Sequence, residues 1–234
     1  MRKLSILILS LIIAVSLGII IYKSYLYHKD KSVYLEIQKY KPNIADFKEE
    51  STVNQEEMKL LNINSDYKFW ISIGNTKVNY PVVQGDNNTF YLKHNFNGEY
   101  SISGTIFVDY RNNINEDKNI IIYGHNMKNG TMFEDINNFK DEKFFNDNYI
   151  SIIKGNKEYK YEVFSVYVVP TNEAVFKVSF KDDDEYLKYL KALAERSLYI
   201  KEVNLDKNSN IITLATCSYE YNNARTIVHA KLLY

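Results

Sequence analysis

A series of short β-type segments between residues 69 and 233 limits the possible folds of this chain more than any other pattern. The chain holds 21 Tyr and 12 Phe residues, and aromatic side chains favour strands. Asn, Gly and Asp residues, which form turns, separate the segments. The predicted strands are residues 69–73, 78–83, 105–109, 119–123, 149–154, 159–169, 174–178, 210–216 and 226–233.

Helical patterns lie around these strands and do not alternate with them. Residues 32–62 are expected to form short helices, in which Asn54 and Glu57 match a capping box. Residues 131–139 predict a short helix, and residues 183–198 a longer one with acidic residues at its start, as the helix dipole favours. The absence of a strand–helix–strand rhythm indicates a mainly β fold with peripheral helices, in the form of a closed or nearly closed β-barrel.

A run of apolar residues from 4 to 22 follows Arg2 and Lys3. As a helix it is about 28 Å long, close to the thickness of a bilayer core. A cleavable signal peptide is the alternative, but its apolar region is usually shorter, and no A-x-A-like cleavage site follows Gly18. We therefore expect an uncleaved anchor. The expected organisation is a short cytoplasmic tail (1–3), a transmembrane anchor (4–22), a linker (23–31) and a domain outside the membrane (32–234), with helices over 32–62 and the barrel over 67–234.

Charge balance and cysteine content exclude several classes of function. The 29 basic residues equal the 29 acidic ones, so the chain lacks the positive field of non-specific nucleic-acid binding, and no nucleic-acid partner is expected. A single cysteine allows neither an intramolecular disulfide nor a multi-thiolate metal site. No P-loop, Rossmann or H-E-x-x-H motif occurs, and we interpret acidic residues 182–185 as a helix start rather than a Ca²⁺ site. We expect no metal and no organic cofactor.

Three side chains that are able to carry chemistry stand at the ends of predicted strands. Cys217 ends one apolar strand, His125 follows another after Gly124, and Arg225 precedes the last strand. Groups at strand ends are reachable from solvent, and a thiol, an imidazole and a guanidinium placed there are able to converge on one end of a barrel. The alternative is that Cys217 is buried and structural, which is the commoner fate of a free cysteine.

The other histidines are interpreted differently. His28 is too near the predicted membrane segment to join a barrel site, and His94 lies in an Asn-rich loop that is typical of surface or hydrogen-bonding residues. His229 lies in the last predicted strand, where alternation puts it on the same face as Ile227 and opposite Val228. We interpret His229 as structural.

The sequence around the three candidate residues resembles that of the sortase family, and the chain is similar to the class B group. The motifs that carry the resemblance are Thr-Leu-Ala-Thr-Cys at residues 213–217, Tyr-Gly-His at residues 123–125, and Arg225. Further similarity lies in residues 79–85, 91–96, 104–111 and 228–232. The resemblance extends from residue 32 to the C-terminus, and the combination is far more specific than any single motif.

The resemblance implies a closed eight-stranded β-barrel with N-terminal helices and a helix inserted before the strand that bears the cysteine. It also implies a membrane-anchored cysteine transpeptidase of a Gram-positive cell surface, with its catalytic domain extracellular. Such an enzyme cleaves a C-terminal sorting signal of a surface protein, of NPxT type in class B, and joins the new carboxyl end to an amine. That amine belongs to a peptidoglycan precursor or cross-bridge, or to a pilin lysine.

The resemblance also implies a role for each candidate residue. Cys217 attacks the Thr carbonyl of the signal to form a thioester, His125 transfers protons, and Arg225 steadies the substrate and the oxyanion. The positions that match the family's substrate-binding groove are Asn88, Leu92, Tyr123, Ala215, Thr216 and Ser218. Two of them depart from the class B pattern, because Ala215 stands where many members have Ser, and Ser218 stands where some have an acidic residue.

Two other functions are kept as alternatives. A membrane-anchored cysteine peptidase would use the same three residues and release its product to water, although no papain-type or caspase-type motif surrounds Cys217. A non-catalytic surface binding module would have Cys217 buried and out of reach of thiol reagents. No acidic helper for catalysis is assigned, because the direction of the nearby Glu220 side chain is open.

Overall fold

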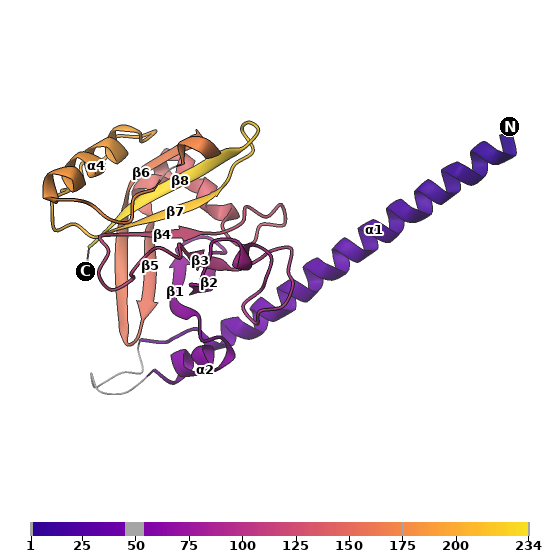
Figure 1. The fold of residues 1–234 in the computed structure, drawn as a ribbon, viewed down its shortest axis with the longest axis horizontal. Coiled ribbons are helices and arrows are strands. Elements are labelled where there is room, and N and C mark those ends of the chain that lie inside the picture. The colour runs from indigo at the N-terminus through magenta and orange to yellow at the C-terminus, as the bar shows by residue number, and fades with distance from the viewer. Residues whose placement is uncertain (1, 45–53, 175, 234) are drawn as a thin grey trace.

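The strands close into a barrel in the computed structural model, which describes residues 2–44, 54–174 and 176–233 (Figure 1). Around the barrel, in the described part of the chain, the order is β1-β2-β3-β4-β7-β8-β6-β5. The β2–β3 and β4–β7 pairs are parallel, and the others are antiparallel. The strands are β1 (Tyr67–Ile73), β2 (Asn79–Val83), β3 (Ile106–Val108), β4 (Asn119–Tyr123), β5 (Tyr149–Lys154), β6 (Lys157–Pro170), β7 (Ile211–Cys217) and β8 (Ala224–Leu232).

Strands β7 and β8 are buried on both faces, which explains their nearly continuous apolar sequences. Leu214 and Val228 belong to the large cluster of the barrel core. Ala215 and Ile227 alternate with them and belong to a separate cluster on the outer face. The outer face of this part of the barrel is therefore covered by other elements, and the segment between β6 and β7 provides that cover.

Helix α4 (Asp183–Glu195) belongs to this cover and lies beside β6 and β7 (Figure 1). It begins where predicted, because the Asp182 carboxylate caps it by accepting a 2.8 Å hydrogen bond from the Glu185 backbone N–H. The apolar side of the helix buries Tyr186, Leu190 and Leu193 in a cluster with residues of β6 and β7. The predicted helix over residues 183–198 is thus confirmed, with an earlier end.

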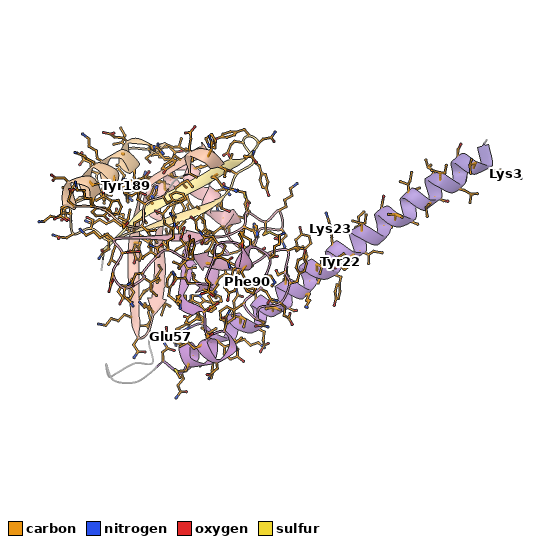
Figure 2. The ribbon with its side chains drawn as sticks, in the orientation of Figure 1. Lys3, Tyr22, Lys23, Glu57, Phe90 and Tyr189 are labelled. Carbon is orange, nitrogen blue, oxygen red and sulfur yellow. The ribbon has the colours of Figure 1, made fainter. Side chains whose placement is uncertain are left out.

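Helix α1 (Arg2–Ile37) is continuous through residues 23–31, the segment that sequence analysis assigned to a linker. Its N-terminal part projects away from the barrel, with Lys3 near its end and Tyr22 and Lys23 near the point where the helix leaves the barrel (Figure 2). The apolar side chains over residues 4–22 are exposed. Among the described residues, α1 is the one helix that is long and apolar enough to cross a membrane.

The C-terminal part of α1 packs on the barrel and leads into η1 (Gln38–Tyr40). After residues 45–53, which lie outside the described residues and include part of the predicted helices over 32–62, the chain enters α2 (Gln55–Ile63). The predicted capping box is confirmed in one half: Asn54 accepts a 3.1 Å hydrogen bond from the Glu57 N–H. The Glu57 carboxylate instead accepts from the Gly155 N–H at 3.2 Å, which ties α2 to the β5–β6 turn.

One prediction of secondary structure is wrong. The described residues of the predicted strand over 174–178 form no strand; Val175 lies outside the described residues. Phe176 packs instead against Tyr123 on the outer face, at 6.3 Å between ring centroids, and the closed barrel leaves no free edge for another strand.

The predicted short helix over residues 131–139 is confirmed in part, with a later start. It appears as the 3₁₀ helix η3 (Glu134–Lys140), which is followed by the short helix α3 (Glu142–Asp147) that sequence analysis missed. Asp141 caps α3 by accepting a 2.8 Å hydrogen bond from the Phe144 N–H. Two further 3₁₀ turns border the site described below, η2 (Phe90–Leu92) and η4 (Thr171–Glu173).

Candidate active site

Cys217 and Arg225 are cross-strand neighbours where β7 passes into β8. Their positions follow from the antiparallel register, which sets the last residue of β7 opposite the second residue of β8. Arg225 Nη1 donates a hydrogen bond to Cys217 Sγ, and both side chains are half-buried. A permanent cation therefore lies against the sulfur and beside the place where negative charge develops during nucleophilic attack.

His125 reaches the same end of the barrel because β4 runs parallel to β7. Gly124 makes the turn after β4, and a Cβ at this position would lie 2.7 Å from the Phe133 ring, so only glycine fits. Two hydrogen bonds fasten the turn to β7: Gly124 N–H to Ala215 O at 3.3 Å, and Thr216 Oγ1 to Gly124 O at 2.7 Å. The turn therefore carries a half-buried imidazole to the end of β7 that bears the thiol.

The His125 ring is oriented by a backbone carbonyl. Its Nε2 atom lies 2.8 Å from Leu92 O, at the end of η2. A carbonyl oxygen only accepts hydrogen bonds, so Nε2 carries the hydrogen, and the lone pair of the neutral ring is on Nδ1. Nδ1 is thus the ring atom that is free to exchange a proton with a substrate.

Asn126 ties the histidine segment to the cysteine segment. Its side-chain Nδ2 donates to Cys217 O at 2.8 Å, and its backbone carbonyl accepts from the Tyr219 hydroxyl at 2.9 Å. Sequence analysis did not single out Asn126, although its position directly after His125 was a usable signal. These bonds fix the separation of the two backbone segments that carry the reactive groups.

A cavity of about 370 Å³ lies at this end of the barrel and brings together Cys217, His125 and Arg225. Five of the six predicted substrate-binding residues line it: Asn88, Leu92, Tyr123, Ala215 and Thr216. The sixth, Ser218, is buried beside Cys217 and is not part of the lining; its Oγ has no hydrogen-bond partner in the described structure. The other lining residues, which sequence analysis did not assign to substrate binding, are Phe107, Gly124, Thr171, Ala174 and Phe176.

One wall of the cavity is held by a buried carboxylate. The Tyr123 hydroxyl donates to Asp109 at 2.9 Å, and Arg111 donates to the same carboxylate through Nε at 2.9 Å and Nη2 at 2.8 Å. Burial acts to raise the pKa of Asp109, but the hydrogen bonds from Arg111 and Tyr123 outweigh it and hold that pKa below its usual value. Burial, together with the charge of Asp109, raises the pKa of Tyr123. Tyr123 is therefore a neutral hydrogen-bond donor that is fixed against an ionised carboxylate.

The remaining candidates lie away from the three converging side chains. Glu220 forms a 2.5 Å ion pair with Lys140 and does not line the cavity. His94 stacks on Phe90 with 4.0 Å between ring centroids. His28 borders a different and larger cavity of about 580 Å³ between α1 and the barrel, which contains none of the three reactive residues. In the part of the chain that the structure describes, no group of His, Cys, Asp and Glu side chains is arranged to hold a metal ion.

His229 is fully buried on the outer face of β8. Its Nε2 lies 2.9 Å from the Tyr167 hydroxyl, and its Nδ1 lies 2.9 Å from Thr213 Oγ1. Burial, with a contribution from the nearby Arg196 cation, lowers the pKa of His229 to about 3. The ring is neutral with both nitrogens bonded, as expected for a structural residue.

Comparison with known proteins agrees with this geometry. The family of the sortase domain matches residues 71–233. Sortase B of Listeria monocytogenes is 37% identical over 186 residues, which are 77% of this chain and 75% of that protein. Sortase B of Staphylococcus aureus is 31% identical over 231 residues, which are 97% of this chain and 94% of that protein.

Solved structures extend the similarity to the fold. The X-ray structure of a mutant form of Clostridium perfringens sortase B superposes with a TM-score of 0.81 at 42% identity and covers 86% of this chain and 97% of that one. A structure of Bacillus anthracis sortase B reaches a TM-score of 0.79 at 34% identity, with coverage of 89% and 98%. The family match, the similarity of sequence and the shared barrel agree, and this chain therefore belongs to the sortase family, as a cysteine transpeptidase of the sortase B type.

Proposed function

We propose that the chain is a membrane-anchored transpeptidase that cleaves a C-terminal NPxT-type sorting signal through a thioester on Cys217. It then transfers the surface protein to an amine of the cell wall or of a pilin. The observation that carries this proposal is the convergence of Cys217, His125 and Arg225 on one cavity, with the guanidinium of Arg225 donating to the sulfur.

The first half-reaction forms the thioester. The Cys217 thiolate attacks the carbonyl carbon of the signal's Thr, and the carbonyl oxygen becomes an oxyanion beside the guanidinium of Arg225. His125 in its protonated form donates from Nδ1 to the leaving nitrogen, because Nε2 is engaged by Leu92 O. The C–N bond breaks, the C-terminal part of the signal leaves as an amine, and the remainder is a thioester on Sγ.

The second half-reaction joins the protein to its acceptor. An incoming amine attacks the thioester carbon, and His125 takes the amine proton at Nδ1. The C–S bond breaks, the thiolate is released, and a new amide bond is formed. The acceptor is a peptidoglycan precursor or cross-bridge amine, or a pilin lysine.

The cavity has both apolar and polar lining residues, as a peptide ligand requires. Phe107, Tyr123 and Phe176 give it apolar walls, and Asn88 lies at its polar border, where its Oδ1 accepts a 3.0 Å hydrogen bond from the Tyr110 N–H. A solved complex of Staphylococcus aureus sortase B with a substrate has the same fold, with a TM-score of 0.78 at 29% identity. We infer that the five predicted cavity residues contact the signal upstream of the scissile bond.

Helix α1 supplies the membrane anchor in this proposal. Its exposed apolar stretch over residues 4–22 matches the thickness of a bilayer core, and Arg2 and Lys3 precede it. Residues 1–3 would then face the cytoplasm, and the barrel would face the cell exterior, where sorting signals are presented.

The test uses the full chain in detergent micelles with a quenched NPxT-type peptide, with and without triglycine, and mass spectrometry of the products. An amine-joined product that requires Cys217, and that is absent in Cys217→Ala, is the expected result. Release of the free acid alone in the presence of triglycine would indicate a peptidase instead. If no signal peptide is cleaved and a thiol reagent fails to label Cys217, the proposed chemistry is wrong.

A further inference from the structure

The helix that leads to the proposed membrane anchor is bonded to a loop beside the active site. Tyr34 of α1 is 5% exposed, and its hydroxyl donates to Gly104 O at 2.5 Å. The same hydroxyl lies 3.1 Å from Thr105 Oγ1. The ring of Tyr34 also packs edge-on against Tyr80 of β2, with 5.4 Å between centroids. The hydroxyl and the ring of Tyr34 thus make separate contacts.

Gly104 lies next to residues 91 and 92, and the carbonyl of Leu92 holds the His125 ring. It has a φ of +59°, and a Cβ there would lie 2.5 Å from Tyr91 O and 2.9 Å from Leu92 O. Gly104 therefore lies close to the Tyr91 and Leu92 carbonyls, and the absence of a side chain allows that approach. Thr105, the next residue, donates its N–H to Tyr91 O at 2.9 Å and its hydroxyl to His94 O at 2.8 Å.

The Leu92 carbonyl is the group that accepts the hydrogen bond from His125 Nε2, at 2.8 Å. Tyr34, Gly104, Leu92 and His125 thus follow one another from α1 to the site. Hydrogen bonds join Tyr34 to Gly104 and Leu92 to His125, and the step between Gly104 and Leu92 is a close approach of the two backbones. The first is on α1 and the last is in the active site.

Other residues of α1 also bind the loop over residues 99–105. The Asp30 carboxylate, in a residue that is 4% exposed, accepts from the Ser103 N–H at 3.2 Å. Lys29 pairs with Glu99 at 3.2 Å. Gln38, just after the helix, donates instead to Asn79 O of β2 at 3.0 Å. Gln38 therefore offers a matched control, because it fastens the same part of the chain to the barrel without touching this loop.

We propose that Tyr34 is a positioning residue for His125, so that the docked part of α1 is a support of the active site. The Tyr34 hydroxyl fixes the Gly104 backbone, Gly104 fixes the direction of the Leu92 carbonyl, and that carbonyl holds the hydrogen on Nε2 and leaves Nδ1 for proton transfer. The consequence for catalysis rests on the proposed function of His125, whereas the consequence for its tautomer does not.

The test compares Tyr34→Phe with Gln38→Ala in the full chain in detergent micelles. Tyr34→Phe keeps the ring and its contact with Tyr80 and removes only the hydroxyl. Nitrogen NMR of ¹⁵N-labelled histidine reports the tautomer of His125, whose signals are assigned by their loss in His125→Gln. Steady-state kinetics of transfer to triglycine gives kcat and KM, and thermal unfolding confirms that both variants are folded.

The expected result is a mixture of His125 tautomers in Tyr34→Phe, with kcat lower by about fivefold and KM nearly unchanged, since orientation of a proton-transfer group acts mainly on kcat. Gln38→Ala should keep the single tautomer and the kcat of the unaltered chain. Gly104→Ala, whose added Cβ would push the Tyr91 and Leu92 carbonyls from the loop side without changing a residue of α1, should change the His125 signals in the same direction.

Unchanged His125 signals and unchanged kcat in Tyr34→Phe would overturn the proposal, and so would equal effects of Tyr34→Phe and Gln38→Ala. If Gly104→Ala does not fold, the comparison of the other two variants decides alone. If the unaltered chain shows no Cys217-dependent transfer but Tyr34→Phe still changes the His125 tautomer, the proposed function fails and the positioning role stands.

Discussion

Two residue pairs on the outer face of β7 and β8 differ in their burial. Cys217 and Arg225 face each other at one end of the strand pair, and Thr213 and His229 face each other four residues further along, a distance of about 13 Å on a strand. The first pair opens into the cavity of about 370 Å³. The second pair is completely buried, with both ring nitrogens of His229 bonded to hydroxyls.

What differs between the two pairs is the covering layer. Beside the Thr213–His229 pair, the Ser165 hydroxyl of β6 donates to Leu193 O of α4 at 2.6 Å, and Phe164 packs on His229 with 6.0 Å between ring centroids. Near Cys217, the segment after β6 contributes Thr171, Ala174 and Phe176 to the wall of the cavity and does not close over it. The same sheet face thus carries a reactive pair where the cover ends and a structural pair where it is complete.

The largest effect is expected from Cys217→Ala, which removes the nucleophile of the open pair. Transfer of an NPxT-type peptide to triglycine should fall by at least about a thousandfold, because no other group takes over a covalent step. The midpoint of thermal unfolding should change little, since Cys217 is half-buried and its side chain is small. Transfer to triglycine that persists in Cys217→Ala would show that the open pair is not the reactive one.

Arg225→Lys tests the other member of the open pair. Lysine keeps the charge but loses the planar fork that reaches the sulfur and the developing oxyanion. We expect kcat/KM to fall by about a hundredfold, or about 3 kcal/mol of transition-state stabilisation. Full activity of Arg225→Lys, measured by product formation at low substrate concentration, would mean that charge alone is sufficient.

Thr213→Val should act on the covered pair and therefore on stability alone. The Thr213 hydroxyl donates to Asn119 Oδ1 at 2.8 Å and contacts His229 Nδ1, so its loss leaves two buried polar groups without this partner. The free energy of unfolding, measured in urea, should fall by about 2 kcal/mol. The activity per folded molecule should stay the same, and a large loss of kcat in fully folded protein would contradict the separation of the two pairs.

The smallest effect is a dependence of stability on pH that comes from His229. Its pKa is about 3 in the folded protein and 6.5 as the ordinary value, so below pH 6.5 the unfolded chain takes up a proton that the folded chain does not. Stability should therefore be complete above pH 6.5 and fall by about 1 kcal/mol over the first pH unit below it. Urea unfolding at pH 6.5 and 5.5 should show a smaller difference in His229→Gln than in the unaltered chain.

The titration of Asp109 sets the lowest pH at which that unfolding experiment is informative. Its pKa is held below its usual value of 3.8, so its contribution to stability is present above that value and is lost at more acidic pH. The effect of Asp109 therefore lies below the interval between pH 6.5 and 5.5, and within that interval the difference between the unaltered chain and His229→Gln isolates the effect of His229. If the unaltered chain and His229→Gln depend equally on pH there, His229 is not the group that titrates.

Sequence patterns predicted the barrel best where a strand is apolar and short. The β4 and β5 strands have the predicted limits, because Ile120, Ile121 and Ile122, like Ile152 and Ile153, form compact apolar runs between polar residues. The apolar residues at 174, 176 and 178 misled the prediction, because they pack on the barrel as a cover without pairing. Helix α3 was missed because six residues are too few to show a helical period.

The convergence of the three candidate side chains was predictable from the sequence, and the groups that hold them in place were not. Cys217, His125 and Arg225 were recognisable by residue type at strand ends. The Leu92 carbonyl that orients His125 lies 33 residues away in sequence, and the Asn126 amide that binds Cys217 O lies 91 residues away. A backbone carbonyl has no side-chain signature, so contacts of this kind appear only after the chain is folded.

The predicted linker over residues 23–31 is helical in the structure. Residues 23–31 are rich in charge, which is typical of a solvated connection, but Asp30 is buried against Ser103 and the helix runs through without a break. Local composition described the exposed side of this segment, and the docked side was visible only in three dimensions.

The unbroken course of α1 also has a geometric consequence for an anchored enzyme. An α-helix turns by about 100° for each residue. With α1 as the proposed anchor, the number of residues between its apolar part and its docked part therefore sets which face of the apolar part lies on the same side as the cavity. One residue added or removed between Tyr22 and Lys29 would rotate the barrel by about 100° around the helix axis, while changing its height by only about 1.5 Å.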